Sequence, residues 1–578
     1  MRMTDHNEAI ILQAGQAQGA ILACDVGLSF WGGVDPETGL IIDALHPHHQ
    51  QSITGKILMM PSSRGSCSGS GVFLSLCLNG KAPAALIFCE DEEILTLGAF
   101  VASHLFDKTC PVIRLDRHSF DKLASNDRAT IDDTTISAQT ITLRCESLKF
   151  EQLELSQEEQ SWLEGRSGHA QKIAMEILRL MCAANGTDHL IDISKGHIDG
   201  SIYCHEANLI FAEKMKEIGA QLRVPTTINA ISVDRELWPL QSVERDFADK
   251  AVALADAYVS MGAAPVFTCA PYLLENAPEA GENIGWSESN AVIFANSILG
   301  ARTLKHPDYL DLFIAMTGKA PASGVYLDDH RKAQMTIAFC LPENTLADDL
   351  IWPLMGWLTG TIAPSHIPFV TGLESVPATQ DDLKAFCAAF GTTSGAPLVH
   401  IKGHSAEAHL PQITDQLSAK ASQKVNLHDL RGAWHRLNHN FLKNQRSVDL
   451  IAIGSPHASF EEVAEIHRLL SMRSIHDDIT MMVTVGRPTL AKLKQTGLFE
   501  SLTHLGLSII ADLCWCSITE PVFPASASTI MTNSAKYAHY AYGLSGRPAR
   551  LASLQECVET AISGETLVNM PNWLRTGS

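Results

Sequence analysis

The chain has 578 residues, of which 46% are hydrophobic and 19% are charged, and its formal net charge is −21 at pH 7. This length exceeds the size at which one hydrophobic core usually stops growing, so we expect at least two domains. The negative charge and the lack of any Lys/Arg block argue against binding to nucleic acid, because polyanions are bound by clustered basic side chains. Small-molecule chemistry is the better expectation.

The cysteine spacing, the N-terminal residues and the longest apolar run indicate the compartment of the protein. The 14 cysteines lack the short spacings of a disulfide framework or a zinc site. The N-terminal sequence MRMTDH turns polar at once, so we expect no secretory segment, reduced thiols and a cytoplasmic location. Residues 351–373 could span a bilayer by length, but three prolines and three glycines interrupt them. We expect a buried loop and a short helix there, and no membrane association.

The first part of the chain alternates short apolar strands with helices. The pattern predicts strands at 56–60, 84–88 and 111–115 and helices at about 70–78 and 93–105. Residues 118–155 are rich in Asp, Ser, Thr and Lys and have no sustained apolar period, which predicts a linker with one returning strand. We therefore place a domain boundary there, between a domain at 1–145 and a larger region at 150–578.

The larger region is predicted to begin with a helix and to contain six strands that end in polar tips. Ser156-Gln157-Glu158-Glu159 has the form of a capping box, and an amphipathic helix to about Ala184 is predicted to follow. The six strand-and-tip segments are 190–197, 224–229, 266–272, 398–404, 450–457 and 509–514. Ligands of open α/β sheets bind outside the carboxyl ends of strands, so the six tips predict one shared cleft.

The loop Pro61–Gly71 is rich in serine and glycine and lies between a predicted strand and a predicted helix. Free backbone N–H groups at a helix start form an anion site, and the forked guanidinium of Arg64 suits a carboxylate. An ordinary flexible turn explains the same composition equally well.

Two cysteines and several polar residues occupy predicted strand tips. Cys269 and Cys514 are placed as iron–sulfur ligands require, although their spacing alone favours inert buried cysteines. Further tip residues could orient or protonate a substrate, although a structural role is commoner for any one of them: Lys195, His197, Lys402, His404 and His457. Glu288 lies beside hydroxyl and amide side chains at a predicted helix start, where capping is the alternative explanation.

Several long motifs resemble the aconitase X family. They are GLSFWGGVDPETG at 27–39, GKIL at 55–58, the Arg64-Gly65-Ser66 loop, CAPY at 269–272, GWSESNAV at 285–292, ANS at 295–297, GART at 300–303, GSPHAS at 454–459 and TNSAKYAHY at 532–540. They span nearly the whole chain in the family's order. The resemblance implies an α/β, aconitase-like fold in one fused chain, with a small swivelling β/α domain followed by a large, multi-lobed α/β catalytic region.

The resemblance also implies an activity. The fused form of the family is associated with dehydration of cis-3-hydroxy-L-proline to Δ1-pyrroline-2-carboxylate, and the two-subunit archaeal form resembles a mevalonate 5-phosphate dehydratase. We therefore expect a hydro-lyase for a small hydroxylated amino acid that works as a monomer or small homo-oligomer. Two alternatives stay open: a dehydratase of another hydroxy acid, and a non-catalytic, iron-responsive protein. A zinc-binding module is the weakest alternative, because no zinc-ligand spacing occurs.

Roles for single residues follow from the same resemblance. Ser66 matches the family's catalytic serine, which removes the α-proton, and Arg64 would hold it and the substrate carboxylate. The expected substrate contacts are His197, Asn229, Glu288, Ser289, Ser534 and Lys536. The expected cofactor is an iron–sulfur cluster of the [2Fe-2S] type on Cys269 and Cys514, with iron assisting loss of the hydroxyl group.

One departure from the family pattern concerns the cluster. The segment that is Gly-Cys-Pro-His in many relatives is Gly454-Ser455-Pro456-His457 in this chain. A thiolate ligand is therefore lost at that position. The candidates for the third ligand are the Ser455 oxygen and the thiols of Cys516, Cys204 and Cys67.

Overall fold

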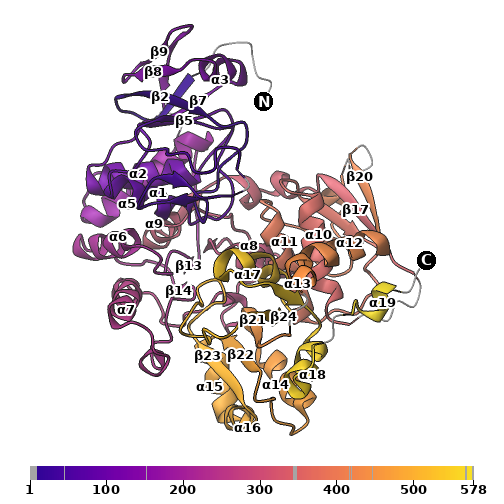
Figure 1. The fold of residues 1–578 in the computed structure, drawn as a ribbon. Coiled ribbons are helices and arrows are strands. Elements are labelled where there is room, and N and C mark those ends of the chain that lie inside the picture. Colours follow the sequence, from indigo (N-terminus) through magenta and orange to yellow (C-terminus); the bar gives the residue numbers. More distant parts are fainter. Residues whose placement is uncertain are drawn as a thin grey trace. The chain divides into compact units, whose positions relative to one another are not determined.

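The computed structural model describes residues 9–575, apart from 45, 151–152, 343–347, 416, 418–419, 445–446 and 567–568. The polar N-terminal sequence on which we based the absence of a secretory segment lies outside these residues. The chain forms two compact units (Figure 1). The first unit contains Met1–Thr226, Asp256–Ala263 and Lys305–Ser323, and the second contains Thr227–Ala255, Ala264–Leu304 and Gly324–Ser578.

The first unit is built on a nine-stranded mixed sheet with the strand order β10-β9-β8-β2-β5-β6-β7-β1-β11. Its central strands β2, β5, β6 and β7 run parallel to one another. These strands and the two connecting helices are β2 (Ala17–Ala23), β5 (Ile57–Met59), α1 (Gly69–Leu78), β6 (Ala85–Phe88), α2 (Ile94–Phe106) and β7 (Val112–Leu115). The elements predicted between residues 56 and 115 are confirmed to within one residue at each end.

The predicted linker at 118–155 is wrong. The segment instead supplies α3 (Arg117–Ala124), β8 (Arg128–Ile131), β9 (Thr135–Ala138), β10 (Thr142–Arg144) and β11 (Glu146–Ser147). Strands β8, β9 and β10 pair antiparallel at one edge of the sheet, and β8 alternates exposed and buried residues. An antiparallel edge with one face in water carries polar side chains at every second position, which lowered the apolar content that the prediction relied on.

The predicted helix from Ser156 to Ala184 is two helices. Ser156 and Glu159 form the predicted capping box at the start of α4 (Gln157–Leu163). The chain then leaves the helical path at Gly165 and Gly168, whose φ angles are +79° and +98°, before α5 (His169–Asn185) begins. Both glycines adopt a backbone conformation that other residues rarely take. The remaining elements of this unit include β1 (Ala9–Gln13), β3 (Val34–Asp35), β4 (Leu40–Ile41), β12 (Leu190–Asp192), β13 (Gly196–Ile198), α6 (Glu206–Glu217), α9 (Leu310–Thr317) and β16 (Lys319–Pro321).

The second unit contains a five-stranded parallel sheet with the order β23-β22-β21-β24-β25. The strands are β21 (Leu450–Ala458), β22 (Thr480–Val485), β23 (Leu507–Ala511), β24 (Ile530–Thr532) and β25 (Ala549–Leu551). The chain enters at β21 and adds β22 and β23 on one side, then returns to place β24 on the other. The order of strands therefore reverses between β21 and β24, where ligands of such sheets usually bind.

Helices cover both faces of this sheet, which lies at the lower part of Figure 1. Ile451 and Ile453 point to one face, where α14 (Phe460–Leu470) and α18 (Leu554–Ser563) pack. Leu450 and Ala452 point to the other face, against α17 (Ala535–Ser545). The period of two in β21 follows from the alternation of side chains along a strand buried on both faces. Helices α15 (Arg487–Gln495) and α16 (Leu498–His504) also pack on the α14 side.

A second parallel sheet has the order β19-β18-β17-β20. The apolar run at 351–373 forms α10 (Ile351–Ile362) and the strand β18 (Pro368–Thr371), so the predicted short helix is confirmed and part of the predicted loop is a strand. Among the described residues, no helix combines the length and apolar character needed to cross a bilayer. The other elements include β14 (Thr226–Ile228), α7 (Arg245–Ser260), β15 (Gly285–Trp286), α8 (Ser289–Phe294), β17 (Met335–Cys340), α11 (Gln380–Thr393), β19 (His400–Ile401), β20 (Ser422–Asn426), α12 (Leu427–Leu437), α13 (His439–Asn444) and α19 (Asn572–Arg575).

Candidate active site

The predicted site residues fall into two groups by unit. Ser66, Arg64 and His197 belong to the first unit. Those of the second unit are Asn229, Cys269, Glu288, Ser289, Cys514, Ser534 and Lys536.

Ser66 lies in the loop between β5 and α1, at the carboxyl end of a central strand. Its side chain is half-buried, and its Oγ accepts a hydrogen bond from the backbone N–H of Ser68 at 3.3 Å. The Ser66 carbonyl accepts from the N–H of Gly69, the first residue of α1, at 3.1 Å. The hydroxyl therefore sits beside the start of a ten-residue helix, where the helix dipole favours negative charge.

The glycine-rich motif at 27–33 packs beneath this loop. Gly65 has a φ of +93°, and a Cβ at that position would lie 2.4 Å from the Oγ of Ser29. A Cβ on Gly27 would lie 2.5 Å from the carbonyl oxygen of Ser62. The two segments therefore approach as closely as they do only because both positions are glycine.

Arg64 and His197 have different surroundings within the first unit. The Nη2 of Arg64 lies 3.0 Å from Oδ2 of Asp43, and 49% of the Arg64 side chain is exposed. A guanidinium has five N–H donors, so this ion pair leaves capacity for a second carboxylate. His197 is on β13 and is fully buried. Cys67 and Cys204, two of the candidates for the third ligand, also belong to this unit.

Three cysteines gather in the second unit, and we call them the thiol cluster: Cys269, Cys514 and Cys516. Cys269 and Cys514 are 1% and 3% exposed and pack with Ala230, and Cys516 packs against them. The neighbouring Cys269 thiol and burial raise the pKa of Cys514 well above its ordinary value. Without a cation the Cys514 thiol is therefore neutral, and a bound metal centre would deprotonate it. Of the candidates for the third ligand, Cys516 lies with the two predicted ligands.

His457 connects the segments that carry the thiol cluster. Its backbone N–H donates to the Sγ of Cys269 at 3.3 Å, and its Nε2 donates to the carbonyl oxygen of Leu513 at 2.6 Å. The hydroxyl of Thr268 lies 3.1 Å from its Nδ1. Burial lowers the pKa of His457 to about 4, so the ring is neutral at pH 7. A single tautomer, with the proton on Nε2, satisfies both ring contacts.

The polar wall next to the thiol cluster contains Glu288 and Lys536. Their Oε1 and Nζ atoms lie 2.9 Å apart, and the side chains are only 14% and 12% exposed. Burial lowers the pKa of Lys536, but the negative charge of the Glu288 carboxylate, together with the three cysteines in their thiolate form, outweighs burial and raises it well above its ordinary value. The Nδ2 of Asn229 lies 3.5 Å from Oε2 of Glu288, and the Nδ2 of Asn290 donates to its Oε1. Lys536 is therefore a buried cation that is held by one carboxylate.

The three serines of this region differ in role. Ser534 caps α17, because its Oγ accepts from the N–H of Tyr537 at 3.1 Å while its hydroxyl donates to the Ser455 carbonyl. Ser289 is the first residue of α8 and is half-buried. Glu288 precedes that helix but its side chain does not cap it, so capping does not explain Glu288. The Ser455 hydroxyl oxygen is buried and has no hydrogen-bond partner among the described residues.

The predicted strand tips have mixed outcomes. The ends of β21 and β24 meet at the reversal point of the five-stranded sheet, and the end of β23 joins them through Leu513 and His457. Residues 266–272 form a loop and a short 3₁₀ helix rather than a strand. Lys402 and His404 follow β19 of the four-stranded sheet and contact Glu374 and the Leu373 carbonyl, so their contacts are structural.

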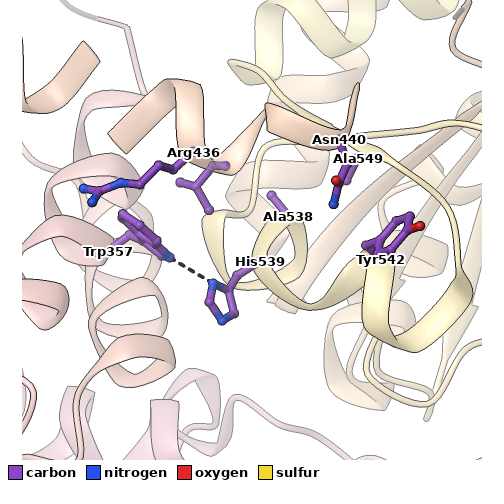
Figure 2. A pocket seen from close by; sticks show the side chains of 8 residues that line it. Trp357, Arg436, Asn440, Ala538, His539, Tyr542 and Ala549 are labelled. Atoms are coloured by element: carbon purple, nitrogen blue, oxygen red, sulfur yellow. Dashed lines mark hydrogen bonds between the residues drawn. The ribbon is translucent and has the colours of Figure 1, made fainter. Parts of the chain in front are cut away.

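A cavity of about 90 Å³ lies elsewhere in the second unit, between α10, α12 and α17 (Figure 2). It is lined by Trp357, Arg436, Leu437, Asn440, Ala538, His539, Tyr542 and Ala549. Trp357 donates from Nε1 to Nδ1 of His539 at 3.2 Å. None of the predicted site residues lines this cavity, and its volume suits a few water molecules.

Sequence reasoning missed the ion pair between Arg487 and Asp512. The pair lies beside the thiol cluster, and Asp512 is two residues before Cys514. Arg487 is the first residue of α15, whereas Asp512 follows β23 and lies 25 positions further along the chain, so no local pattern indicates the contact.

The side-chain atoms that could bind a metal indicate which cofactor the thiol cluster suits. In the part of the chain that the structure describes, no three His, Cys, Asp or Glu side chains stand ready to hold a single metal ion. The thiol cluster has soft sulfur donors, an apolar wall and a backbone N–H aimed at sulfur. These features are typical of protein sites for iron–sulfur clusters. The residues present therefore fit such a group.

Comparisons with known proteins agree with this architecture. Family models match the "Aconitase X swivel domain" at residues 6–141, the first domain at 152–329, the second at 333–435 and the third at 448–563. The chain is 42% identical over 573 residues to the cis-3-hydroxy-L-proline dehydratase of Pseudomonas aeruginosa, covering 97% of each chain. It is 33% identical to the phosphomevalonate dehydratase large subunit of Thermococcus kodakarensis, over 70% of this chain and 98% of that one.

A solved structure gives the same result for the fold. The crystal structure of Thermococcus kodakaraensis aconitase X in its holo-form superimposes with a TM-score of 0.63 at 30% identity, over 71% of this chain and 100% of that one. The predicted fold class, a swivelling domain followed by larger α/β domains, is confirmed by this neighbour and by the family models. Because four models of one family and a relative that is 42% identical cover nearly the whole length, the chain belongs to the aconitase X family.

Proposed function

We propose that the chain is a hydro-lyase that removes water from cis-3-hydroxy-L-proline and yields Δ1-pyrroline-2-carboxylate. The observation that carries this proposal is the 42% identity, over 97% of both chains, to a relative named for that dehydration. The retained Ser66 loop and the buried polar wall beside the thiol cluster support a catalytic role rather than a purely binding one.

Ser66, as its alkoxide, is proposed to remove the proton from the α-carbon. That carbon lies between an ammonium group and a carboxylate and is only weakly acidic, so negative charge must be stabilised where it develops. The start of α1 offers a positive helix end at the Ser66 hydroxyl. The exposed guanidinium of Arg64 is proposed to hold the substrate carboxylate.

Lys536 is proposed to protonate the departing β-hydroxyl group, which then leaves as water. The reaction forms a C=C bond from the α-C–H and β-C–O bonds that break, and the resulting enamine becomes the cyclic imine by proton transfer. Glu288 holds the Lys536 ammonium in place at 2.9 Å. His197, Asn229, Ser289 and Ser534 stay predictions as substrate contacts.

We propose that Cys269, Cys514 and Cys516 hold an iron–sulfur cluster of the [2Fe-2S] type. Bound there, the cluster would supply a Lewis acid for loss of the hydroxyl group. The backbone N–H of His457 favours the charged form of the Cys269 sulfur. The assignment of Cys516 in place of a thiol at position 455 rests on its packing with the other two cysteines.

Charge favours an amino acid over a phosphorylated substrate. A phosphate group carries about two negative charges and is usually held by several free cations. Arg64 is paired with Asp43, and Lys536 is paired with Glu288. A substrate with one carboxylate and one ammonium group suits such neutralised pairs better. This proposed enzyme would act in the cytoplasm on a small molecule, as a monomer or small homo-oligomer, and its division at 145–150 stays a prediction.

The test is a turnover assay after anaerobic purification. Wild type, Ser66→Ala and Ser62→Ala are incubated with cis-3-hydroxy-L-proline, and Δ1-pyrroline-2-carboxylate is detected with a coupled reductase. Ser62→Ala is the matched control, because Ser62 lies in the same loop but bonds to the exposed Asp91 carbonyl. We expect Ser66→Ala to lose about 10²–10⁴-fold in turnover, the range for removal of a positioned acid or base. Ser62→Ala should keep it.

Two outcomes contradict the proposal. Iron-loaded wild type that turns over mevalonate 5-phosphate but not cis-3-hydroxy-L-proline refutes the substrate. Iron-loaded wild type that binds cis-3-hydroxy-L-proline without converting it favours the non-catalytic, iron-responsive alternative.

A further inference from the structure

Within the thiol cluster, Cys269 and Cys514 each follow a residue in an unusual backbone conformation. Phe267 has a φ of +40° and lies two residues before Cys269, and Asp512 has a φ of +69° and lies two residues before Cys514. Residues other than glycine rarely adopt the left-handed region, and they keep it only where the surroundings hold them there. The two turns that present Cys269 and Cys514 are therefore held in place by their neighbours.

Arg487 holds the second of these turns. Its Nε donates to Oδ1 of Asp512 at 2.7 Å and its Nη2 donates to Oδ2 of the same carboxylate. The Asp512 side chain is fully buried, and Oδ2 also accepts the backbone N–H of Arg235 at 3.1 Å. Two parallel hydrogen bonds fix the orientation of the carboxylate as well as its distance.

The same guanidinium joins a second segment to the end of β23. The Nη2 of Arg487 lies 3.1 Å from Oδ1 of Asp234, whose Oδ2 accepts the N–H of Ala511 at 3.3 Å. The Asp512 carbonyl accepts the N–H of Ile231 at 2.7 Å. This segment begins next to Ala230, the apolar wall of the thiol cluster. Arg487 therefore fixes both the Cys514 turn and the wall that faces it.

The turn before Cys269 is also held by an arginine, through a contact with an aromatic ring. The guanidinium of Arg235 lies 5.2 Å from the centroid of the Phe267 ring, and Phe267 is 2% exposed. A cation that lies over the face of an aromatic ring is attracted to the ring electrostatically. Since the backbone N–H of Arg235 also binds Asp512, the two turns are linked through one residue.

The stability of the fold alone does not explain why the buried carboxylate of Asp512 is paired with Arg487. Apolar side chains of similar volume often stabilise a fold as well as a buried ion pair does, whereas a forked ion pair also sets direction. We propose that Arg487 and Asp512 are positioning residues that fix the turn of Cys514, so that its thiol and that of Cys516 face the iron–sulfur cluster. This inference rests on the proposed function of the thiol cluster.

The experiment measures iron retention in the full-length protein, separately from turnover. Asp512→Asn keeps a side chain that tolerates the left-handed region but removes the charge that faces Arg487. Arg487→Lys keeps the positive charge but loses the fork. Glu407→Gln is the matched control, because Glu407 accepts from Nε of the buried Arg331 at 2.7 Å. Each protein is reconstituted anaerobically with iron and sulfide, then assayed for iron per chain, electron paramagnetic resonance after reduction, and release of iron to a chelator.

We expect Asp512→Asn and Arg487→Lys to retain iron about 10-fold or more weakly than wild type, as when a group that orients a metal ligand is removed, and to change the resonance spectrum. Glu407→Gln should match wild type in both measurements. Arg487→Lys decides the question if Asp512→Asn fails to fold. Wild-type iron content, spectrum and release in a folded Arg487→Lys variant overturn this inference and leave the proposed function intact. Wild type that binds no iron overturns the cluster assignment itself.

Discussion

Glu288 and Lys536 form an ion pair of 2.9 Å between residues that are 248 positions apart, and both side chains are largely buried. Lys536 is the second residue of α17, and Glu288 comes directly before α8. The pair therefore links the starts of α8 and α17 next to the thiol cluster.

Breaking this pair from one side is expected to destabilise the protein and abolish turnover. Lys536→Met leaves a buried carboxylate without its cation, and Glu288→Gln leaves a buried ammonium without its anion. A broken buried pair typically loses about 3–5 kcal/mol of stability. The double variant removes both charges, so its melting temperature should lie closer to wild type than either single variant, while turnover stays lost. Melting curves and the dehydration assay on all four proteins measure this.

A matched control separates stability from chemistry in that experiment. Lys319 and Glu159 form another poorly exposed ion pair, at 3.0 Å, in the first unit. Lys319→Met should lower the melting temperature but keep turnover of the folded enzyme. Additive losses in the Glu288/Lys536 double variant would show that the two side chains do not act as a pair.

Gly65→Ala is expected to disturb the Ser66 loop. The new Cβ would lie 2.4 Å from Ser29 Oγ on a backbone with φ of +93°. Strained backbone of this kind lowers stability by about 1–3 kcal/mol, and relief of the clash would shift Ser66. Gly32→Ala is the control, because Gly32 also has a positive φ, +69°, but a Cβ added there would meet no atom within 4 Å. Turnover should fall in Gly65→Ala and persist in Gly32→Ala, and equal losses would contradict this account.

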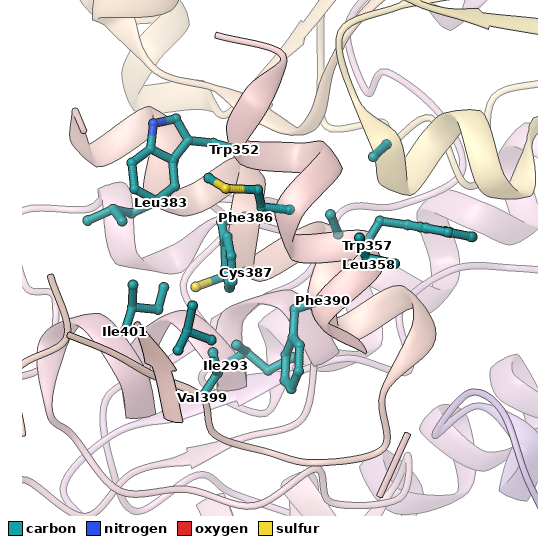
Figure 3. Packing of buried hydrophobic residues seen from close by; sticks show 14 of the residues in the cluster. Ile293, Trp352, Trp357, Leu358, Leu383, Phe386, Cys387, Phe390, Val399 and Ile401 are labelled. Carbon is teal, nitrogen blue, oxygen red and sulfur yellow. The ribbon is translucent and has the colours of Figure 1, made fainter. Parts of the chain in front are cut away.

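Gly356→Ala is expected to separate α10 from α11. A Cβ on Gly356 would lie 2.2 Å from the carbonyl oxygen of Phe386, in the core where Trp352, Phe386 and Phe390 pack (Figure 3). Overpacking of this kind typically lowers stability by about 1–3 kcal/mol. Gly432→Ala on α12 meets nothing within 4 Å, so it should raise stability by up to about 1 kcal/mol through helix propensity. Thermal melting should therefore shift in opposite directions, and shifts of the same sign would refute the packing argument.

The stability of the second unit is expected to depend on pH through Asp349. Burial raises the pKa of Asp349 to about 7 from its ordinary value of 3.8. The native state therefore binds more protons than the unfolded state between these two values, so this carboxyl group lowers the free energy of unfolding as pH rises from about 4 to about 7. Above pH 7 this decrease in the free energy of unfolding is complete.

Asp349→Asn tests this pH dependence. The amide oxygen can still accept the N–H of Leu554, which lies 2.9 Å from Oδ2 of Asp349, but the variant carries no charge. Its melting temperature should exceed that of wild type by a few degrees at pH 8 and approach it at pH 4. Asp133→Asn, which removes an exposed carboxylate, should keep the wild-type profile. A profile of Asp349→Asn that parallels wild type over this range would contradict the assignment.

The sequence by itself determined the strands and helices at residues 56–115, the capping box at Ser156 and the family. The strands and helices between residues 56 and 115 and the capping box at Ser156 are recognised from neighbouring residues, because apolar period and capping act over a few positions. Long motifs such as residues 27–39 also identified the family. The prediction of a linker from the composition of residues 118–155 was wrong, because polar residues there belong to antiparallel strands with one face in water.

Only the tertiary structure decided which residues surround the two predicted cysteines. It brought Cys516 to Cys269 and Cys514, placed His457 between Thr268 and Leu513, and joined Arg487 to Asp512. The hydrogen-bonded partners lie from 25 to 189 residues apart, and Cys516 and Cys269 are separated by a still longer stretch of chain. Such contacts depend on the order of strands in the sheet, and above all on the reversal between β21 and β24, which no local sequence pattern encodes.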